Sequence, residues 1–561
     1  MMKLNLQKNK TSYLFWIGLL LFFGMNLFSA ATMGIHFDEA YYWLYSKYPA
    51  FGYFDHPPMV AWMIYAGQLI FKNILGLRIV TVIFSTISAY ILWLISKPYA
   101  NKPLLFWALM YSIILIHPYT FITTPDAPLL FFTVVFFFSY QKYTNSPNTK
   151  NLLLFALVSA LLIYSKYHAI LLIGFTILSN LKWMLKKDFW INALLIVVCL
   201  SPHIYWQISN DFVSFKYHLI DSHKNTYRIG VTLNYLLSQL LLTGPWMGWL
   251  FLYVLTVIKV ETQSEKALKY VGMGTFIFFF FATFSGDIES HWTLIAFIPL
   301  LILSFKYLST TERWRKLIYI SGGINFILLL TFKIILITPL ASHIYAMRLF
   351  TGWQNDSEIL KTAIGDYPVL FQDSWNRASR YAWYVNDPKV SGLNSGMYRK
   401  NQFDLWNHDE EFTGQSVCMV SRDSAQFTDA IKVKTPKSTW YYKIIPNFKS
   451  YYDLTFKTLN NIPQKECKSI DVSISNPYTN DVLLDQQLNN SRFIVYQRMD
   501  SQWKQLIEIP IAGLTIPANS QRDFHIEFPK PINLSEMKGI YLMLQIGEIR
   551  PIPTRILVSD D

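Results

Sequence analysis

Two acidic clusters follow the first apolar stretch of this chain. Asp38 and Glu39 stand where that stretch ends, and Asp55 and His56 follow within HFDEAYYWLYSKYPAFGYFDHPP at positions 36–58. Ionised carboxylates are costly at the edge of a bilayer, so such a cluster indicates a functional site. A carboxylate that is oriented and partly desolvated there can act as a general base toward a hydroxyl group. The aromatic and Pro-Pro surroundings favour a packed segment over a loop that only faces water.

A further carboxylate, Asp126, follows Pro125 at the start of another apolar stretch. Pairing Asp126 with Asp38 would create either a base with its orienting partner or a site for a divalent cation. If a cation binds, Asp55 and His56 are further candidate ligands. A divalent cation is the only cofactor that these residues suggest, and nothing in the sequence requires it.

Donors and aromatic rings in the same set of loops could hold a substrate. Cationic and N–H donor groups suit an anionic leaving group such as a phosphate, and tyrosine rings could stack on a sugar, although a membrane aromatic belt also explains them. On a helical start Glu39 projects about 100° away from Asp38, so the two are not expected to face one substrate atom. The expected substrate contacts are Glu39, Tyr42, Tyr53, Asp55, His56, Lys166, His168 and His291.

The composition places these residues in a membrane protein. Of 561 residues, 52% are apolar, 17% aromatic and only 15% charged, whereas soluble domains carry about 25% charged residues. The net charge of +13 is spread in small clusters beside apolar runs, which is typical of positive-inside loops and gives no nucleic-acid signature. Three cysteines exclude a disulfide scaffold; Cys418 and Cys467 could pair in an oxidising compartment, but two separate buried thiols are commoner.

Apolar runs of the length that a bilayer requires predict about eleven transmembrane helices. They lie near residues 12–33, 78–96, 103–122, 127–141, 151–165, 168–184, 189–208, 232–258, 271–286, 292–308 and 317–338. Basic residues alternate with the acidic loops, which predicts a cytoplasmic N-terminus and an outer face that carries the candidate site. Residues 57–77 would invert this pattern if they crossed, so we interpret them as an interfacial helix, with Lys72 and Arg78 snorkelling toward headgroups.

The composition becomes soluble after about residue 340. We expect a transmembrane domain at 1–340, an extracytoplasmic α/β region at 341–436 and an extracytoplasmic β-rich domain at 437–561, where alternating segments separated by Pro, Asn and Gly predict a small antiparallel sandwich. The fold class is thus a polytopic α-helical membrane protein with a soluble C-terminal region.

Four short motifs together resemble a known family. The Asp38-Glu39 pair, FDHPP at 54–58, TPDAP at 124–128 and SKYH at 165–168 are similar, in this order, to the C-type integral-membrane glycosyltransferases, in particular the bacterial branch related to protein O-mannosyltransferases and lipid A aminoarabinose transferase. The resemblance covers about residues 10–340. It implies a polyprenyl-phosphate-linked sugar as donor and inverting transfer on the extracytoplasmic face of the inner (cytoplasmic) membrane.

The resemblance also implies roles for single residues. Asp38 matches the catalytic base, and Asp126 matches a second acid that orients the acceptor or shares a metal. Asp55-His56 stands where aminoarabinose transferases carry Glu-Lys ahead of proline, so the donor sugar and the metal stay open. The phosphate would leave toward Lys166 and the histidines. The expected activity is hexosyl or pentosyl transfer to a lipid, glycan or protein acceptor; a flippase for a lipid-linked sugar and a membrane-anchored binding protein are the alternatives.

Overall fold

The computed structural model describes residues 2–219, 227–395, 398–406, 408, 410–424, 427, 429–451, 453–459, 466–499, 502–533 and 540–555. The chain divides into two compact units, Met1–Thr351 and Gly352–Asp561. Each unit has its own hydrophobic core, and each is described by itself below.

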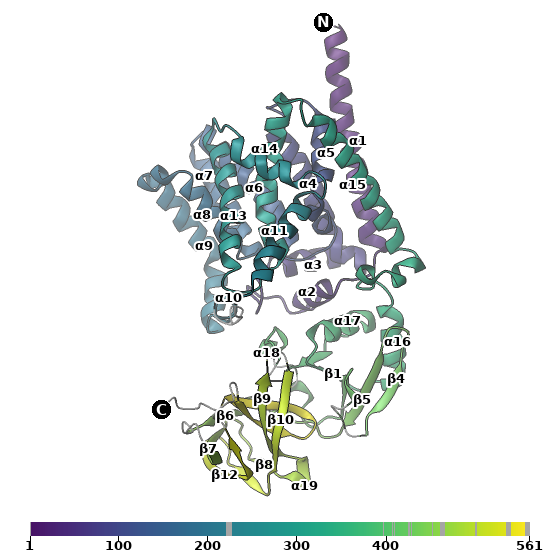
Figure 1. Cartoon of the computed structure of the whole chain (residues 1–561), viewed down its shortest axis with the longest axis vertical. Helices are drawn as coiled ribbons and strands as arrows, with labels where there is room; N and C mark the ends of the chain where they lie inside the picture. Colours follow the sequence, from purple (N-terminus) through teal and green to yellow (C-terminus); the bar gives the residue numbers. More distant parts are fainter. Residues whose placement is uncertain are drawn as a thin grey trace. The chain divides into compact units, whose positions relative to one another are not determined.

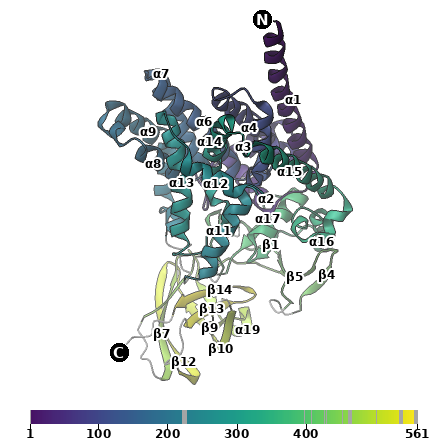
Figure 2. The same ribbon diagram turned by 45° about the horizontal axis from the view of Figure 1, so that its top comes forward.

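The first unit is a helical bundle, from which the N-terminal part of α1 projects (Figures 1 and 2). Its α-helices are α1 (Met2–Thr32), α2 (Phe37–Lys47), α3 (Met59–Ile70), α4 (Ile74–Ser96), α5 (Pro103–Ser112), α6 (Asp126–Asn145), α7 (Thr149–Ser165), α8 (Ala169–Leu178), α9 (Lys187–Ser209), α10 (Val213–Leu219), α11 (Ile229–Thr243), α12 (Gly248–Val257), α13 (Gln263–Ala282), α14 (Phe297–Thr310) and α15 (Arg315–Leu336). Short 3₁₀ helices connect them at Ile114–Ile116 (η1), Pro118–Thr120 (η2), Leu181–Leu185 (η3), Ser290–Ala296 (η5), Pro339–His343 (η6) and Tyr345–Met347 (η7).

Several of these helices can cross a bilayer. In the described part of the chain, five are long and apolar enough, and the number rises to seven if each of two bent pairs is one span. The first pair, Pro103–Ser112 with Ile114–Thr120, bends by 80°, and the second, α11 with α12, bends by 94°. These helices confirm the predicted polytopic membrane fold, whereas the number of eleven spans stays a prediction.

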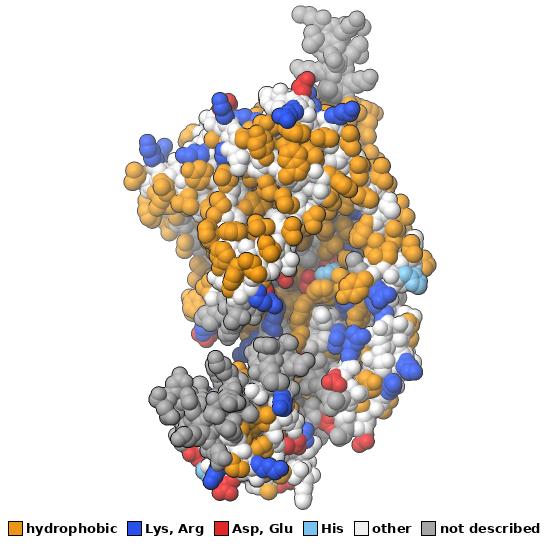
Figure 3. Space-filling model, in the orientation of Figure 1, with side chains coloured by type: hydrophobic (Ala, Val, Ile, Leu, Met, Phe, Trp, Pro, Cys, Tyr) orange, Lys and Arg blue, Asp and Glu red, His pale blue; other side chains and the backbone are white. Residues whose placement is uncertain are grey.

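The surface of this unit matches its proposed environment. Apolar side chains cover most of its flank, and Lys and Arg side chains gather at the end near the N-terminus (Figure 3). Beneath this surface, a large core of buried aromatic and aliphatic side chains joins α1, α4, α5, α6 and α14. An apolar flank with basic residues at one end is the pattern that the positive-inside rule predicts.

The segment predicted to be interfacial forms α3 and the turn into α4, and a side-chain cap marks the start of α4. The Asn73 side chain accepts hydrogen bonds from the N–H groups of Leu75 and Gly76 and so caps α4. A Cβ atom on Gly67 would lie 2.0 Å from the Gly76 carbonyl oxygen, and one on Gly76 would lie 1.7 Å from that of Phe71. Only glycine therefore permits this tight return, which brings the start of α4 beside α2 and α3.

The second unit begins with a five-stranded sheet of order β2-β1-β3-β5-β4. Its elements are α16 (Trp353–Ile364), β1 (Val369–Gln372), α17 (Trp375–Val385), β2 (Ser391–Leu393), α18 (Phe403–Trp406), η8 (Glu410–Phe412), β3 (Val417–Ser421), β4 (Ile431–Lys434) and β5 (Thr439–Ile445). β1 pairs in parallel with β2 and β3, and β5 is antiparallel to β3 and β4. This sheet therefore extends past residue 436, where the sequence suggested that the α/β region ends.

The remaining strands are antiparallel and enclose one further core. They are β6 (Thr455–Thr458), β7 (Glu466–Asn476), β8 (Val482–Leu484), β9 (Arg492–Met499), β10 (Gln502–Pro510), β11 (Leu514–Ile516), β12 (Ser520–Asn533), β13 (Ile540–Ile546) and β14 (Ile549–Arg555), with the short helix α19 (Gln486–Asn489). Strands β10-β9-β13-β14 and β12-β7-β6 form two sheets, and Val472 of β7, Val495 of β9 and Leu542 of β13 share their core. A sheet-rich C-terminal region was expected from the alternating sequence.

Both cysteines of the second unit are buried free thiols in different sheets. Cys418 lies in β3 and Cys467 in β7. Burial raises the pKa of the Cys418 thiol to about 12 and also raises that of Cys467. The two residues form separate thiols and no disulfide, which is the commoner of the two outcomes that the sequence left open.

Candidate active site

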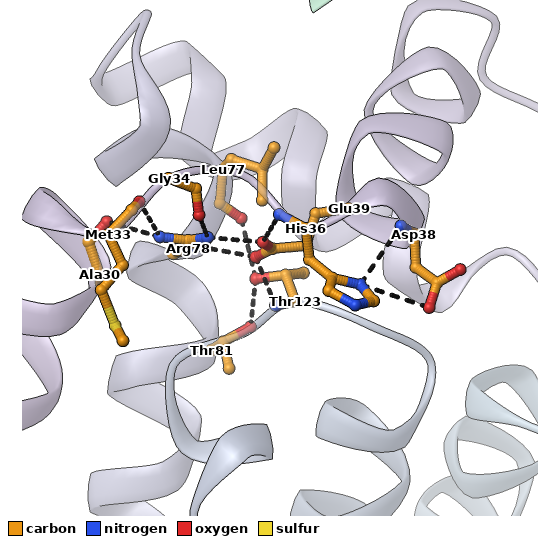
Figure 4. Close-up of polar contacts among 10 residues, drawn as sticks. All are labelled: Ala30, Met33, Gly34, His36, Asp38, Glu39, Leu77, Arg78, Thr81 and Thr123. Carbon is orange, nitrogen blue, oxygen red and sulfur yellow. Dashed lines mark hydrogen bonds and ion pairs between the residues drawn. The ribbon is translucent and has the colours of Figure 1, made fainter. Parts of the chain in front are cut away.

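Glu39 is locked into a buried ion pair with Arg78 at the start of α2 (Figure 4). Both side chains are 0% exposed, and Arg78 donates from Nε to Glu39 Oε1 at 2.7 Å and from Nη2 to Oε2 at 2.6 Å. The N–H of His36 donates to Oε2 at 3.0 Å, and the N–H of Thr123 donates to Oε1 at 2.9 Å. A carboxylate accepts about four hydrogen bonds, so Glu39 has no lone pair left for a substrate.

This arrangement corrects two expectations from the sequence. Glu39 was expected to contact substrate, but its carboxylate is saturated by protein donors and shielded from solvent. Arg78 was expected to snorkel toward headgroups, but its guanidinium is buried and also donates to the carbonyl oxygens of Ala30, Met33 and Gly34. All five guanidinium N–H groups thus have acceptors, and the pair joins the end of α1 to the start of α4.

The same buried network reaches the loop that precedes α6. The Thr123 hydroxyl donates to the carbonyl oxygen of Leu77 at 3.0 Å and lies 2.7 Å from the hydroxyl of Thr81. Together with its N–H bond to Glu39, these contacts tie Thr123 to both α2 and α4. Because Asp126 follows three residues later at the first turn of α6, the network positions Asp38 and Asp126 from one rigid framework.

Asp38 points away from the Glu39–Arg78 pair (Figure 4). Its side chain is 31% exposed, and one carboxylate oxygen lies 3.4 Å from Nδ1 of His36. His36 is also the N-cap of α2 and forms a capping box with Glu39. Two neighbouring residues on one helix turn therefore have different environments. Glu39 faces the interior, and Asp38 faces the accessible side.

Asp126 is paired with Lys166, which stands between α7 and α8. Lys166 Nζ donates to the two carboxylate oxygens of Asp126 at 2.7 and 2.9 Å, and both side chains are nearly buried. His291 Nε2 lies 3.9 Å from the same carboxylate. The structure therefore brings together three of the expected site residues, with Lys166 held on Asp126 instead of standing alone as a phosphate ligand.

The Tyr42 phenol is subject to the negative charges of several carboxylates. Burial raises the pKa of its phenol well above the usual value, and the negative charges of Asp38, Asp55 and Asp126 raise it further. The charges of these three carboxylates, from three different segments, therefore all act on one buried phenol, which stays protonated. The Tyr42 ring also lies 5.8 Å from that of His56, centroid to centroid.

Tyr53 and His168 occupy packed positions. The Tyr53 ring is 0% exposed and stacks on Tyr45 at 4.1 Å, and its hydroxyl donates toward the carbonyl oxygens of Tyr45 and Tyr48. This packing disfavours the predicted stacking of Tyr53 on a sugar, because the side chain is buried and its hydroxyl is used within the protein. His168 packs between the rings of Phe279 and Trp292 at 5.7 and 5.5 Å.

Comparison with known proteins fits this geometry. Residues 55–206 match the family model described as dolichyl-phosphate-mannose-protein mannosyltransferase. The chain is 23% identical over 348 residues to the lipid A galacturonosyltransferase RgtD of Rhizobium johnstonii, covering 57% of this chain and 71% of that protein.

Solved structures decide the fold. ArnT from Cupriavidus metallidurans in the apo state aligns with a TM-score of 0.57 at 9% identity, over 78% of this chain and 98% of ArnT. Its structure bound to undecaprenyl phosphate aligns with a TM-score of 0.53 at 11% identity, over 77% of this chain and 97% of ArnT. The chain has the C-type glycosyltransferase fold. This is the fold that the four motifs led us to expect.

The C-type glycosyltransferase fold does not bring the candidate metal ligands of this chain together. Among the residues that the structure describes, no three His, Cys, Asp or Glu side chains lie close enough to hold a metal ion. Asp126 faces the ammonium group of Lys166, and the Asp55 carbonyl oxygen contacts Nε2 of His218 at 2.8 Å. Of the four candidate cation ligands Asp38, Asp126, Asp55 and His56, Asp126 is thus paired with a protein cation, Lys166, and the cation site stays a prediction.

Sequence reasoning missed Arg78 and Thr123 as parts of this candidate site. Arg78 carried a signal, because an ionisable residue inside an apolar run is a functional hypothesis by default. Thr123 carried none, because its main contribution is a backbone N–H aimed at Glu39. His36, which caps α2 and contacts Asp38, is the third residue that the sequence did not single out.

Proposed function

We propose that this chain transfers a sugar from a polyprenyl-phosphate donor to an acceptor hydroxyl (or phosphate) at the extracytoplasmic face, with inversion, and that Asp38 is the base. The observation that carries the proposal is the difference in exposure among the carboxylates. The Asp38 side chain is 31% exposed, whereas those of Glu39 and Asp126 are 0% and 7% exposed and paired with Arg78 and Lys166. Asp38 is therefore the carboxylate that an acceptor can reach.

The reaction follows from this placement. The acceptor oxygen attacks the anomeric carbon, the bond from that carbon to the phosphate oxygen breaks, and Asp38 takes the hydroxyl proton. Partial desolvation by the surrounding Tyr42 and His36 keeps the carboxylate basic and oriented. The departing phosphate carries away the electron pair, and Lys166 and His291, beside Asp126, supply donors for it. The acid Asp126 holds Lys166 in place for that task.

Donor, acceptor and membrane are proposed on separate grounds. The structural match to ArnT bound to undecaprenyl phosphate supports a polyprenyl-phosphate donor. The relative named a lipid A galacturonosyltransferase supports a saccharide on a membrane lipid as acceptor. Basic side chains at the N-terminal end of the bundle support a cytoplasmic N-terminus and an outward site in the inner membrane (Figure 3).

Replacing Asp38 by Asn tests the proposal, because Asn keeps the size and hydrogen bonding of Asp and removes its basicity. Single-turnover transfer from a polyprenyl-phosphate sugar should fall by about 10²–10⁴-fold, the usual contribution of a general base. Asp287→Asn is the matched control, because Asp287 is 54% exposed and its ion pair with Arg228 lies at the surface. The control should react at the wild-type rate. Near-normal turnover in Asp38→Asn, with a normal size-exclusion profile, would remove the base assignment.

A further inference from the structure

The parallel part of the five-stranded sheet has a switch point. From β1 the chain passes through α17 to β2 on one side, and from β2 it crosses to β3 on the other side of β1. Where strand order reverses in this way, a crevice opens at the carboxyl ends of the strands, and ligands of open α/β sheets bind there. In this unit the carboxyl ends of β1 and β3 mark that place.

Two arginines stand at this edge. Arg377 lies in the first turn of α17, just after β1, and Arg422 follows β3 directly. Their guanidinium carbons lie 6.0 and 5.8 Å from the centroid of the same Trp440 ring, which belongs to β5. Two positively charged side chains, which follow two different strands, thus lie against the same indole ring.

The cationic character extends to a second tryptophan. The ring of Trp353 lies 6.3 Å from that of Trp440. Arg380 lies 4.4 Å and Lys437 lies 5.1 Å from the Trp353 centroid. Cation–π contacts of this kind stabilise single cations by about 0.5–2 kcal/mol.

Within the described part of the second unit, the arginine pair forms no ion pair with a carboxylate. In the described part of the second unit, neither Arg377 nor Arg422 has an acidic oxygen within 4.0 Å. Asp373, the acid at the end of β1, accepts from the N–H and hydroxyl of Ser395 at 2.5 and 2.8 Å. Burial and the charge of Arg422 lower the pKa of Arg377 to about 10. A cation in the first turn of a helix is also placed at the positive end of its dipole.

One buried polar atom at the same place also has no protein partner. The Trp440 side chain is 2% exposed, and its Nε1–H has no acceptor among the described residues. Leaving a buried donor without an acceptor costs about 1–3 kcal/mol. This edge, where α/β sheets bind ligands, therefore has an excess of hydrogen-bond donors and of positive charge. A ligand with anionic oxygen atoms would match both.

We propose that this switch point binds the phosphate group of a phosphorylated saccharide. Two guanidinium forks match the oxygens of a phosphate monoester, and the α17 N-terminus adds N–H donors of the same polarity. All residues of this site belong to the second unit, whereas the Asp38 carboxylate cluster belongs to the first. The site would let the soluble unit select glycans that carry a phosphate, independently of the transfer reaction.

Isothermal titration of the full-length protein in neutral detergent tests the proposal. The ligands are glucose 1-phosphate, inorganic phosphate and glucose. Wild-type protein should bind glucose 1-phosphate saturably and glucose not at all. Arg377→Gln and Arg422→Gln should each weaken binding roughly tenfold or more, because a charge-assisted bidentate contact is lost. Arg522→Gln, a matched arginine 6.0 Å from the Phe524 ring in the sandwich, should bind as wild type does.

Further arms separate the alternatives. Arg422 is exposed, so its substitution leaves the fold intact even if Arg377→Gln unfolds the unit. Arg377→Lys keeps the charge and should retain part of the affinity. Equal binding in Arg422→Gln and wild type, or the absence of saturable binding in wild type, overturns the site. Inorganic phosphate binding as tightly as glucose 1-phosphate overturns the saccharide part and leaves an anion site. Turnover is not the readout, so failure here is separate from failure of the Asp38 proposal.

Discussion

Replacing Glu39 by Gln should unfold the active-site framework while leaving the proposed base in place. The amide would present an NH₂ group to two of four donors that now point at carboxylate oxygens, from Arg78, His36 and Thr123. It would also leave the Arg78 charge without its counter-ion at 0% exposure. Removing one partner of such a buried pair costs about 3–5 kcal/mol. The effect should therefore appear first as lost stability.

The measurement is the free energy of unfolding in mixed micelles, followed by circular dichroism as SDS is added. Glu261→Gln is the matched control, because Glu261 is 77% exposed and lies 3.5 Å from Lys306. A surface pair of this kind contributes about 0–1 kcal/mol, so the control should change little. A double-mutant cycle with Arg78→Gln should give a coupling energy of about 0.5–3 kcal/mol, as expected for residues in direct contact. Glu39→Gln as stable as Glu261→Gln would refute the reasoning.

Three further outcomes are expected. Asp126→Asn should lower both stability, by about 3–5 kcal/mol, and single-turnover transfer, because the Lys166 ammonium loses its buried counter-charge; Asp126→Asn/Lys166→Met should regain stability but not turnover. Because the pKa of Cys418 is raised to about 12, its thiol stays protonated from pH 7 to 9, and mass spectrometry should find it unlabelled by maleimide until the protein is denatured. A chain ending after Tyr451 should keep a protease-resistant five-stranded sheet in limited proteolysis, whereas one ending after Trp440 should not, because it cuts β5. Labelling of Cys418 in folded protein, equal proteolysis of the truncations, or unchanged turnover in Asp126→Asn would contradict these expectations.

Local patterns in the sequence predicted the membrane class and the position of the carboxylates. Apolar runs and basic loops carry that information in single segments, so α1, α4 and α9 lie close to predicted spans. The bends between α5 and Ile114–Thr120 and between α11 and α12 were not predicted. A run of apolar residues indicates that a segment is buried or in lipid, but not whether its helix axis changes direction. β5 was assigned to the sandwich for a similar reason, since strand pairing with β3 depends on contacts that the sequence does not display.

The roles of adjacent acids could not be read from the sequence either. Asp38 and Glu39 have the same chemistry and are adjacent in the sequence. They differ because Glu39 pairs with Arg78, which lies 39 residues further along the chain. Arg78 in turn looked like an interfacial residue, because snorkelling is common for arginine at the end of a span. Only the fold shows that its guanidinium turns inward to a carboxylate and three carbonyl oxygens.

The order of these residues in the chain has a consequence for biogenesis. An arginine at the centre of a translocating helix costs about 2.5–3.5 kcal/mol to insert, and Arg78 lies near the N-terminal end of α4. Glu39 leaves the ribosome earlier, so under the proposed topology the counter-charge of Arg78 is already outside when α4 enters the translocon. The carbonyl oxygens of Ala30, Met33 and Gly34 at the end of α1 arrive with it. The first two long helices can therefore be matched as a hairpin during synthesis, before Thr123 completes the framework around the site.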